Sequence, residues 1–353
     1  MQSAVDEGVF PGAVLLFGIG ENLLFHKAFG FATLHPEKEP LHIDTIFDLA
    51  SLTKPLATTL GIMGLVEQGL LFLDQSLNEL THSIGLPENS GITLRHLLAH
   101  SAGFPPYHPY YLELDRIQGN RKEKLQEWVE NTRLIYSPGT QTLYSDLGFI
   151  LLEKIFEDTA GEDLHVWTTK NIYNPLGLHQ MGFRPLEAPG VADPSAYAAT
   201  EDCPWRKKIL RGEVHDENAY AVGGISGQAG LFGTALEIFR LLRAMKKSYD
   251  EKQKSEIFNG ELVHIFWERQ HEGEKTGRAL GFDVPAGENS STGRFFSRNS
   301  VGHLGFTGTS FWLDLEKDLI VILLTNRVHP TRANEKIRVF RPLIHDRIIQ
   351  ETF

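Results

Sequence analysis

The sequence predicts an α/β (α+β) protein in which one antiparallel sheet combines strands from both ends of the chain. Near the N-terminus, residues 12–19 and 23–32 have the pattern of a β-hairpin. Near the C-terminus, residues 303–315 and 319–326 have the pattern of two more strands, followed by a helix over about residues 332–350. Strands at both ends must be buried, so we expect them to form one sheet with terminal helices packed on it.

A helix-rich region lies between these ends. Helical periodicity is clear in four segments, which are residues 94–100, 122–132, 148–161 and 234–249. We therefore expect an α/β sheet domain made of residues 1–58 and 222–353, and a mainly helical domain, residues 59–221, inserted into it. The active site is expected at the interface of the two. The pattern does not determine the strand order.

Composition excludes several classes of protein. The 353 residues are 41% hydrophobic and 22% charged, which is typical of a soluble globular protein. A net charge of −11 argues against nucleic acid or anionic membranes as principal partners. The single cysteine, Cys203, rules out an internal disulfide and a cysteine-based metal site.

The first residues carry no sign of export. They lack a basic segment, and Asp6 and Glu7 interrupt the apolar run, so no signal peptide is expected. A cytoplasmic location is then the default, although an exported protein given without its leader would look the same. No apolar run is long enough to span a bilayer. The oligomeric state is not indicated.

The stretch DLASLTKPLATTL (48–60) contains the first candidate catalytic residues. If it is helical, Ser51 and Lys54 share a face and Pro55 falls in the first turn. No other serine of the chain has a lysine three positions later. A serine needs a nearby base to become a nucleophile, and a lysine is such a base when burial favours its neutral form. We interpret the two residues as nucleophile and base.

Two later segments extend this interpretation. Tyr144 precedes the helical segment and is placed to move protons between Ser51, Lys54 and a leaving group; the alternative is a tyrosine packed at a helix start beside an Asp N-cap. Gly305 lies in a glycine-rich strand start, where it would let a substrate approach backbone N–H groups that form half of an oxyanion hole.

In this order, SLTK (51–54), YSD (144–146) and HLG (303–305) resemble the three active-site motifs of the class C β-lactamase and penicillin-binding-protein-like serine hydrolases. The resemblance covers nearly the whole chain. It implies a β-lactamase/transpeptidase-like fold and an acyl-enzyme mechanism that requires no cofactor or metal.

Residue roles follow from this resemblance. It implies that Ser51 is acylated, that Lys54 is its base and that Tyr144 relays protons. The backbone N–H groups of Ser51 and Phe306 would form the oxyanion hole.

The motifs depart from the β-lactamase pattern at two positions. Asp146 replaces the usual asparagine, and an anion there should keep Lys54 charged and leave more of the proton transfer to Tyr144. His303 replaces the usual lysine, and a neutral histidine binds a substrate carboxylate less well. Slow turnover of penicillins is therefore expected.

The stretches Val214–Ala219 and Gly223–Phe232 resemble most the branch that contains cell-wall-recycling amidases acting on N-acetylmuramoyl-L-alanine. This implies a small substrate, a muropeptide fragment. A promiscuous carboxylesterase, a weak β-lactamase, a D-aminopeptidase, a D,D-carboxypeptidase and, in another class, a non-catalytic ligand-binding sensor stay open. So does the question whether His215, Asp216 and Glu217 contact the substrate.

Three other motifs are interpreted as structural rather than catalytic. Lys275-Thr276-Gly277 is a literal Lys-Thr-Gly, but its charged surroundings indicate a solvated turn. His96 and His100 have the spacing of a metal pair, yet no third ligand is evident, so they are read as structural. Ser101 lies in an imperfect nucleophile-elbow motif without the strand–turn–helix context.

Overall fold

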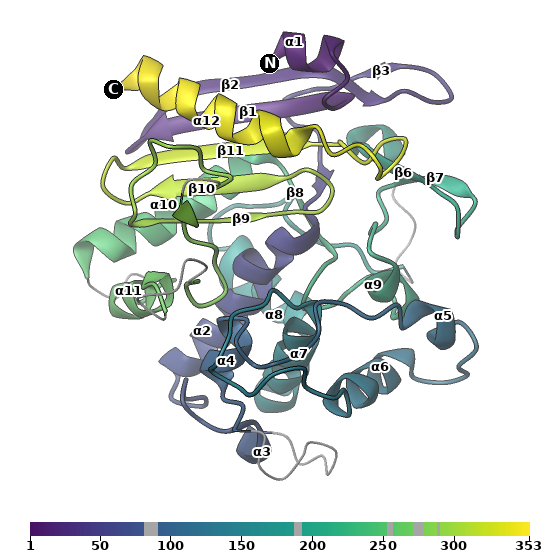
Figure 1. Ribbon diagram of the computed structural model, residues 1–353, viewed down its shortest axis with the longest axis vertical. Helices are drawn as coiled ribbons and strands as arrows, with labels where there is room; N and C mark the ends of the chain where they lie inside the picture. Colours follow the sequence, from purple (N-terminus) through teal and green to yellow (C-terminus); the bar gives the residue numbers. More distant parts are fainter. Residues whose placement is uncertain (81–90, 187–192, 253–256, 271–277, 288–289) are drawn as a thin grey trace.

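The protein is built around a six-stranded antiparallel sheet with helices on both faces (Figure 1). The structure, a computed structural model, describes residues 1–80, 91–186, 193–252, 257–270, 278–287 and 290–353. The strand order is β3-β2-β1-β11-β10-β9. The strands are β1 (Gly12–Ile19), β2 (Asn22–Thr33), β3 (Glu39–Pro40), β9 (Ser300–Leu304), β10 (Ser310–Asp314) and β11 (Leu319–Thr325).

The two ends of the chain meet in the middle of this sheet, as predicted. β1 pairs with β2 in the expected hairpin and with β11 on its other side, where Ala13 lies opposite Thr325. The prediction of one strand over residues 303–315 is wrong, because β9 ends at Leu304 and a turn leads into β10. Gly308 in that turn has a φ of +106°, which other residues rarely adopt, so the chain reverses there.

Alternate side chains of the central strands face two different cores. Leu15 and Leu323 pack with helices α1 (Gln2–Asp6) and α12 (Ile337–Thr352). Val14 and Ile322 face the larger core, which is covered by α10 (Ala235–Glu251). The C-terminal helix starts later than predicted, because Asn334 accepts a hydrogen bond from the Lys336 backbone N–H in a turn just before it.

The four predicted helical segments are confirmed. Their ends are set by caps: α7 begins at Asp146 because the Ser145 hydroxyl accepts from the Leu147 N–H at 3.2 Å, so the N-cap is Ser145 and not Asp146. The predicted segments are α4 (Leu94–Leu98), α6 (Arg121–Glu130), α7 (Asp146–Ala160) and α10. The remaining helices are α2 (Thr59–Glu67), α3 (Leu77–Leu80), α5 (Tyr111–Leu114), α8 (Leu164–Thr168), α9 (Glu217–Ala221) and α11 (Gly260–Trp267).

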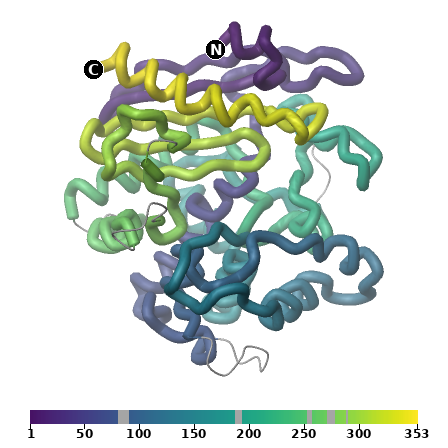
Figure 2. The backbone as a smooth tube through the Cα atoms, in the orientation of Figure 1, coloured from purple at the N-terminus to yellow at the C-terminus, as the bar shows by residue number. Residues whose placement is uncertain are grey.

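Two small sheets lie outside the main one. One has the order β4-β8-β5 and the other pairs β6 with β7. Their strands are β4 (Phe47–Asp48), β5 (Gly182–Phe183), β6 (Ala199–Cys203), β7 (Lys208–Arg211) and β8 (Leu231–Gly233). Residues 59–221 thus contain strands as well as helices, and the division into two domains stays a prediction. Figure 2 follows the chain from the main sheet through α2 into the helical region.

No helix within the described ranges is both long and apolar enough to cross a membrane.

Candidate active site

Ser51 lies in a strained turn directly after β4. A single 3₁₀ turn, Ala50–Leu52, is followed by a π-helical turn, Lys54–Thr58, and only then by α2, so the helix expected here is not continuous. Ala50 has a φ of +48°, an unfavourable value for alanine. Its N–H donates to Asp48 Oδ1 at 2.8 Å and its carbonyl accepts from Thr53 Oγ1 at 2.6 Å. These bonds hold Ser51 at the surface.

Lys54 connects Ser51 to the second motif. Its ammonium donates to Ser51 Oγ at 3.3 Å, to Asp146 Oδ1 at 2.7 Å and to the Gln228 carbonyl at 3.0 Å. The lysine side chain is fully buried, whereas Ser51 is partly exposed. Ser51 and Lys54 thus lie in contact, as their spacing led us to expect, and three acceptors satisfy all three ammonium protons of Lys54.

The pKa of Lys54 is raised above its ordinary value. Burial alone would lower it, but the Asp146 carboxylate and Tyr144 outweigh that effect. Lys54 is thus an ammonium at neutral pH, as Asp146 in the second motif led us to expect. A resting ammonium cannot take the Ser51 proton unless it passes one of its own to Asp146.

Tyr144 lies beside this pair. The Lys54 ammonium is 4.9 Å from the centre of its ring. Among the described residues its buried hydroxyl has no hydrogen-bond partner of good geometry. Burial raises the pKa of Tyr144 to about 12, against the opposing effect of Lys54. The hydroxyl is therefore protonated at rest and available to donate.

His100, which the sequence presented only as half of a metal pair, positions the second motif. Its Nδ1 accepts from the Ser145 N–H at 3.1 Å, and its ring centre is 4.5 Å from that of Tyr144. Burial holds its pKa well below the ordinary value, so it is neutral. His96 instead caps α4 in a reciprocal pair with Thr93. In the described part of the chain no group of three metal-ligating side chains occurs.

The third motif lies across from Tyr144. His303 is buried, its Nδ1 pairs with the Leu304 carbonyl at 2.9 Å, and burial lowers its pKa to about 4, so it is neutral as expected. The approach of a substrate to the backbone at Gly305 stays a prediction, but the structure shows a packing reason for the glycine. A Cβ there would meet Thr309 Oγ1 at 2.0 Å and the Leu49 carbonyl at 2.6 Å. The glycine allows β9 to pack against the nucleophile turn.

Phe306 follows Gly305 at the edge of the site. Its ring is half exposed, but its backbone is held firmly: Arg327 donates to its carbonyl from Nε at 3.0 Å and from Nη2 at 2.6 Å. Thr307 Oγ1 also donates to the Asp48 carbonyl at 2.8 Å, next to the Ser51 turn. The loop with the proposed oxyanion N–H is thereby tied to the nucleophile turn.

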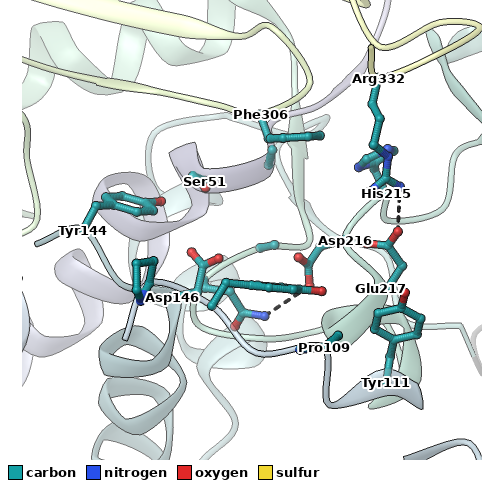
Figure 3. A pocket seen from close by; sticks show the side chains of 15 residues that line it. Ser51, Pro109, Tyr111, Tyr144, Asp146, His215, Asp216, Glu217, Phe306 and Arg332 are labelled. Atoms are coloured by element: carbon teal, nitrogen blue, oxygen red, sulfur yellow. Dashed lines mark hydrogen bonds and ion pairs between the residues drawn. The ribbon is translucent and has the colours of Figure 1, made fainter. Parts of the chain in front are cut away.

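Two cavities meet at Ser51, Tyr144 and Phe306. The first, about 430 Å³, extends toward His215, Asp216 and Glu217, with Asp216 between Ser51 and the far end that holds Arg332 (Figure 3). Its remaining lining residues are Ala50, Pro106, Tyr107, Pro109, Tyr111, Asp146, Gln228 and Ala229. The sequence left open whether His215, Asp216 and Glu217 contact the substrate. All three line the cavity beside the nucleophile.

The second cavity, about 340 Å³, lies on the His303 side and is rich in arginine. Its charged and polar lining residues are Arg278, Asp283, His303, Arg327, Glu335, Arg338 and Arg341. This region therefore contains cations, although the third motif lacks the usual lysine. None of the four arginines could be assigned from sequence, because no motif or fixed spacing relates them to Ser51.

Two arginines of this cavity are buried without a counterion. Arg327 and Arg341 are 7% and 5% exposed, and within the described residues neither has a carboxylate at ion-pair distance. Among the described residues, Arg341 donates to Ser310 Oγ at 3.1 Å and to the Gly308 carbonyl at 3.4 Å. Burial, together with Arg327, lowers the pKa of Arg341 to about 10. An incoming anion would offset this unpaired charge.

The remaining candidates lie away from the nucleophile or outside the described residues. Lys275 belongs to residues 271–277, which the structure does not describe. Ser101 is fully buried, and its hydroxyl has no partner among the described residues. Cys203 is buried in β6, where its sulfur accepts from the Arg206 N–H.

His303→Ala is expected to lower kcat/KM for p-nitrophenyl acetate by about tenfold or more. The centre of the buried His303 ring lies 6.0 Å from that of Tyr144, so its removal would let the Tyr144 side chain move out of position for proton transfer. Lys275→Ala should leave the rate within about twofold, as expected of a solvated charge. Steady-state rates of both folded variants decide the matter, and greater damage from Lys275→Ala would mean that the third motif is misplaced.

The chain is similar to known proteins over nearly its whole length. A family model described as Beta-lactamase matches residues 1–344. A protein of Escherichia coli (strain K12) named "Putative D-alanyl-D-alanine carboxypeptidase" is 32% identical over 94% of this chain and 81% of its own length. A Salmonella typhi protein of the same name is 28% identical, with 96% and 83% covered.

Solved structures share the fold. EstCE1, described as a hydrolase with promiscuous acyltransferase activity, aligns with a TM-score of 0.73 at 23% identity, over 97% of this chain and 96% of its own. The octameric penicillin-binding protein homologue from Pyrococcus abyssi also gives 0.73, at 22% identity, over 97% of this chain and 75% of its own.

Proposed function

The chain belongs to the beta-lactamase family of serine hydrolases, and on that premise we propose that Ser51 forms an acyl-enzyme with a small amide substrate. Its Oγ attacks the carbonyl carbon and the amine leaves; water then attacks the ester and releases the acid. Support comes from the contact between Ser51 Oγ and the Lys54 ammonium at 3.3 Å.

The proton route must begin from a charged Lys54. As Ser51 attacks, Lys54 takes its proton and passes one of its own to Asp146, which it contacts at 2.7 Å. The Tyr144 hydroxyl donates a proton to the leaving amine and is reprotonated from the Lys54–Asp146 pair. One proton thus moves from the serine to the amine, and the same route reversed serves the attacking water.

The tetrahedral oxyanion would be held by the backbone N–H groups of Ser51 and Phe306. Arg327 contributes by fixing the Phe306 carbonyl, which orients the residue's backbone before substrate arrives. The strained Ala50 turn does the same for Ser51.

The arginine-lined cavity is the observation that carries the substrate assignment. It opens beside Ser51 and contains two buried guanidinium groups without a carboxylate partner in the described residues. We therefore propose that the leaving amine carries a free carboxylate, as an amino acid does. A simple alkyl ester would leave these charges unpaired.

Two muropeptide substrates have this chemistry. N-acetylmuramoyl-L-alanine, the substrate that the sequence resemblance implies, would release L-alanine. A peptide ending in D-alanyl-D-alanine would release D-alanine and is favoured by the name of the relatives at 28–32% identity. The promiscuous esterase and the non-catalytic sensor are the alternatives that the experiments below exclude or support.

We expect the protein to release alanine from at least one of these two substrates about tenfold faster than it releases alaninamide from the matching amide-capped analogue, because the amide cannot pair with the arginines. Arg341→Gln should remove most of this preference, since the buried Arg341 guanidinium has no carboxylate partner among the described residues. Arg298→Gln, in a separate cavity, is the matched control. No release from either substrate, with rapid hydrolysis of short-chain esters, would favour the esterase.

A further inference from the structure

The first cavity carries an unbalanced negative charge. Of its three carboxylates, Asp146 pairs with Lys54 at 2.7 Å and Glu217 pairs with Arg332 at 2.6 Å. Asp216 has no cation at ion-pair distance within the described residues. Its Oδ1 accepts from the Ala219 N–H at 2.7 Å and from Gln228 Nε2 at 3.3 Å, and its Oδ2 makes no hydrogen bond to the described chain.

The electrostatics of Asp216 reflect this isolation. Burial and the neighbouring Asp146 raise its pKa to about 6. The same negative charge acts on Tyr107 across the cavity, where burial and the carboxylates of Asp216 and Glu217 raise the pKa of the hydroxyl. A cation placed between these groups would offset the cost of burying Asp216.

His215 presents a second, independent polar atom without a partner among the described residues in the same cavity. The residue is 3% exposed, and its Nε2 lies 3.2 Å from Glu201 Oε2. Although burial opposes it, hydrogen bonding to His215 and Arg332 lowers the pKa of Glu201 to about 2, so Glu201 is ionised. The other ring nitrogen, Nδ1, has no hydrogen-bond partner among the described residues.

The walls of the cavity also suit a cation. Tyr107 and Tyr111 line it from the α5 side. Aromatic faces attract ammonium groups, and more strongly where water is excluded. Carboxylate, imidazole and aromatic rings thus converge on one space that opens onto the nucleophile.

We propose that this cavity binds a primary ammonium group on the acyl part of the substrate, with Asp216 as its counterion and His215 Nδ1 as a second acceptor. The proposal rests on the proposed function only in that Ser51 is the residue acylated. With the arginine-lined cavity on the other side, the site fits a short zwitterionic peptide. A peptide has its ammonium on the acyl side of the scissile bond and its carboxylate on the amine side, which matches the two cavities.

The test uses ester probes whose leaving group carries no carboxylate, so that it is independent of the arginine-lined cavity. The p-nitrophenyl esters of 6-aminohexanoate and 8-aminooctanoate are compared with those of heptanoate and nonanoate, which have the same chain lengths without charge. At about pH 7.5, where Asp216 is ionised, wild type should favour the cationic ester in kcat/KM by about tenfold or more at one of the two lengths.

Asp216→Asn should abolish this preference, so that kcat/KM becomes about equal for the cationic and the neutral ester of one length. The variant should fold, because asparagine still caps α9 and accepts from Ala219. Asp202→Asn removes an exposed carboxylate on β6 and should keep the preference. The proposal is overturned if wild type shows no preference at either length, or if the preference survives in Asp216→Asn. Failure of the alanine-release assay alone would leave this result unaffected.

Discussion

Ser51→Ala is expected to abolish turnover of p-nitrophenyl acetate, reducing it to the uncatalysed rate. The hydroxyl is partly exposed where both cavities meet, and it is the one that contacts the Lys54 ammonium. Without it no acyl-enzyme forms. The fold should persist, because the turn is held by Asp48 and Thr53 rather than by the serine side chain. Initial rates on folded protein measure the effect.

Ser101→Ala is the matched control and should retain most activity. Its hydroxyl is inaccessible and the residue is fully buried, so it cannot reach a substrate. Equal loss from both variants, with both folded, would remove the basis for choosing Ser51. Covalent labelling by a fluorophosphonate probe measures the reactivity of the serine without any turnover. Labelling of wild type that disappears in Ser51→Ala supports a hydrolase. Absence of labelling in wild type supports the non-catalytic sensor.

Lys54→Ala should lower kcat/KM by roughly two to four orders of magnitude, the usual range for losing a general base. The loss also leaves Asp146 without its 2.7 Å partner and the Gln228 carbonyl without a donor. Lys246→Ala is the matched control, since Lys246 is likewise buried and paired with a carboxylate, Asp250, but lies on α10. If both variants lose activity equally, general destabilisation rather than base catalysis is the cause.

Asp146→Asn tests the same relay through its pH dependence. Removing the carboxylate leaves burial as the main influence on Lys54, so the pKa of the lysine should fall. If the lysine must pass through its neutral form, the acid limb of the kcat/KM profile moves to lower pH in this variant. An unmoved or upward-shifted limb would contradict a relay through Lys54.

Several features of this protein were determined locally and could therefore be predicted. The hairpin of β1 and β2 follows from two apolar runs on either side of a short turn. The helix near residue 148 follows from its local periodicity, and Ser145 caps it. Ser51 and Lys54 are three positions apart, so any helical turn brings them together. The effect of Asp146 on Lys54 was predictable once the resemblance placed the two motifs side by side.

Only the tertiary structure decided the rest of the site. Asp48 binds the His215 N–H across 167 positions of sequence, and Lys54 binds the Gln228 carbonyl across 174. Arg341 reaches the second cavity because α12 packs on the sheet beside β10. Such contacts depend on strand order and loop path, which leave no periodic pattern in the sequence. Gly305 shows the same limit: its neighbours, Leu49 and Thr309, are set by packing, so its role could not be read from the motif alone.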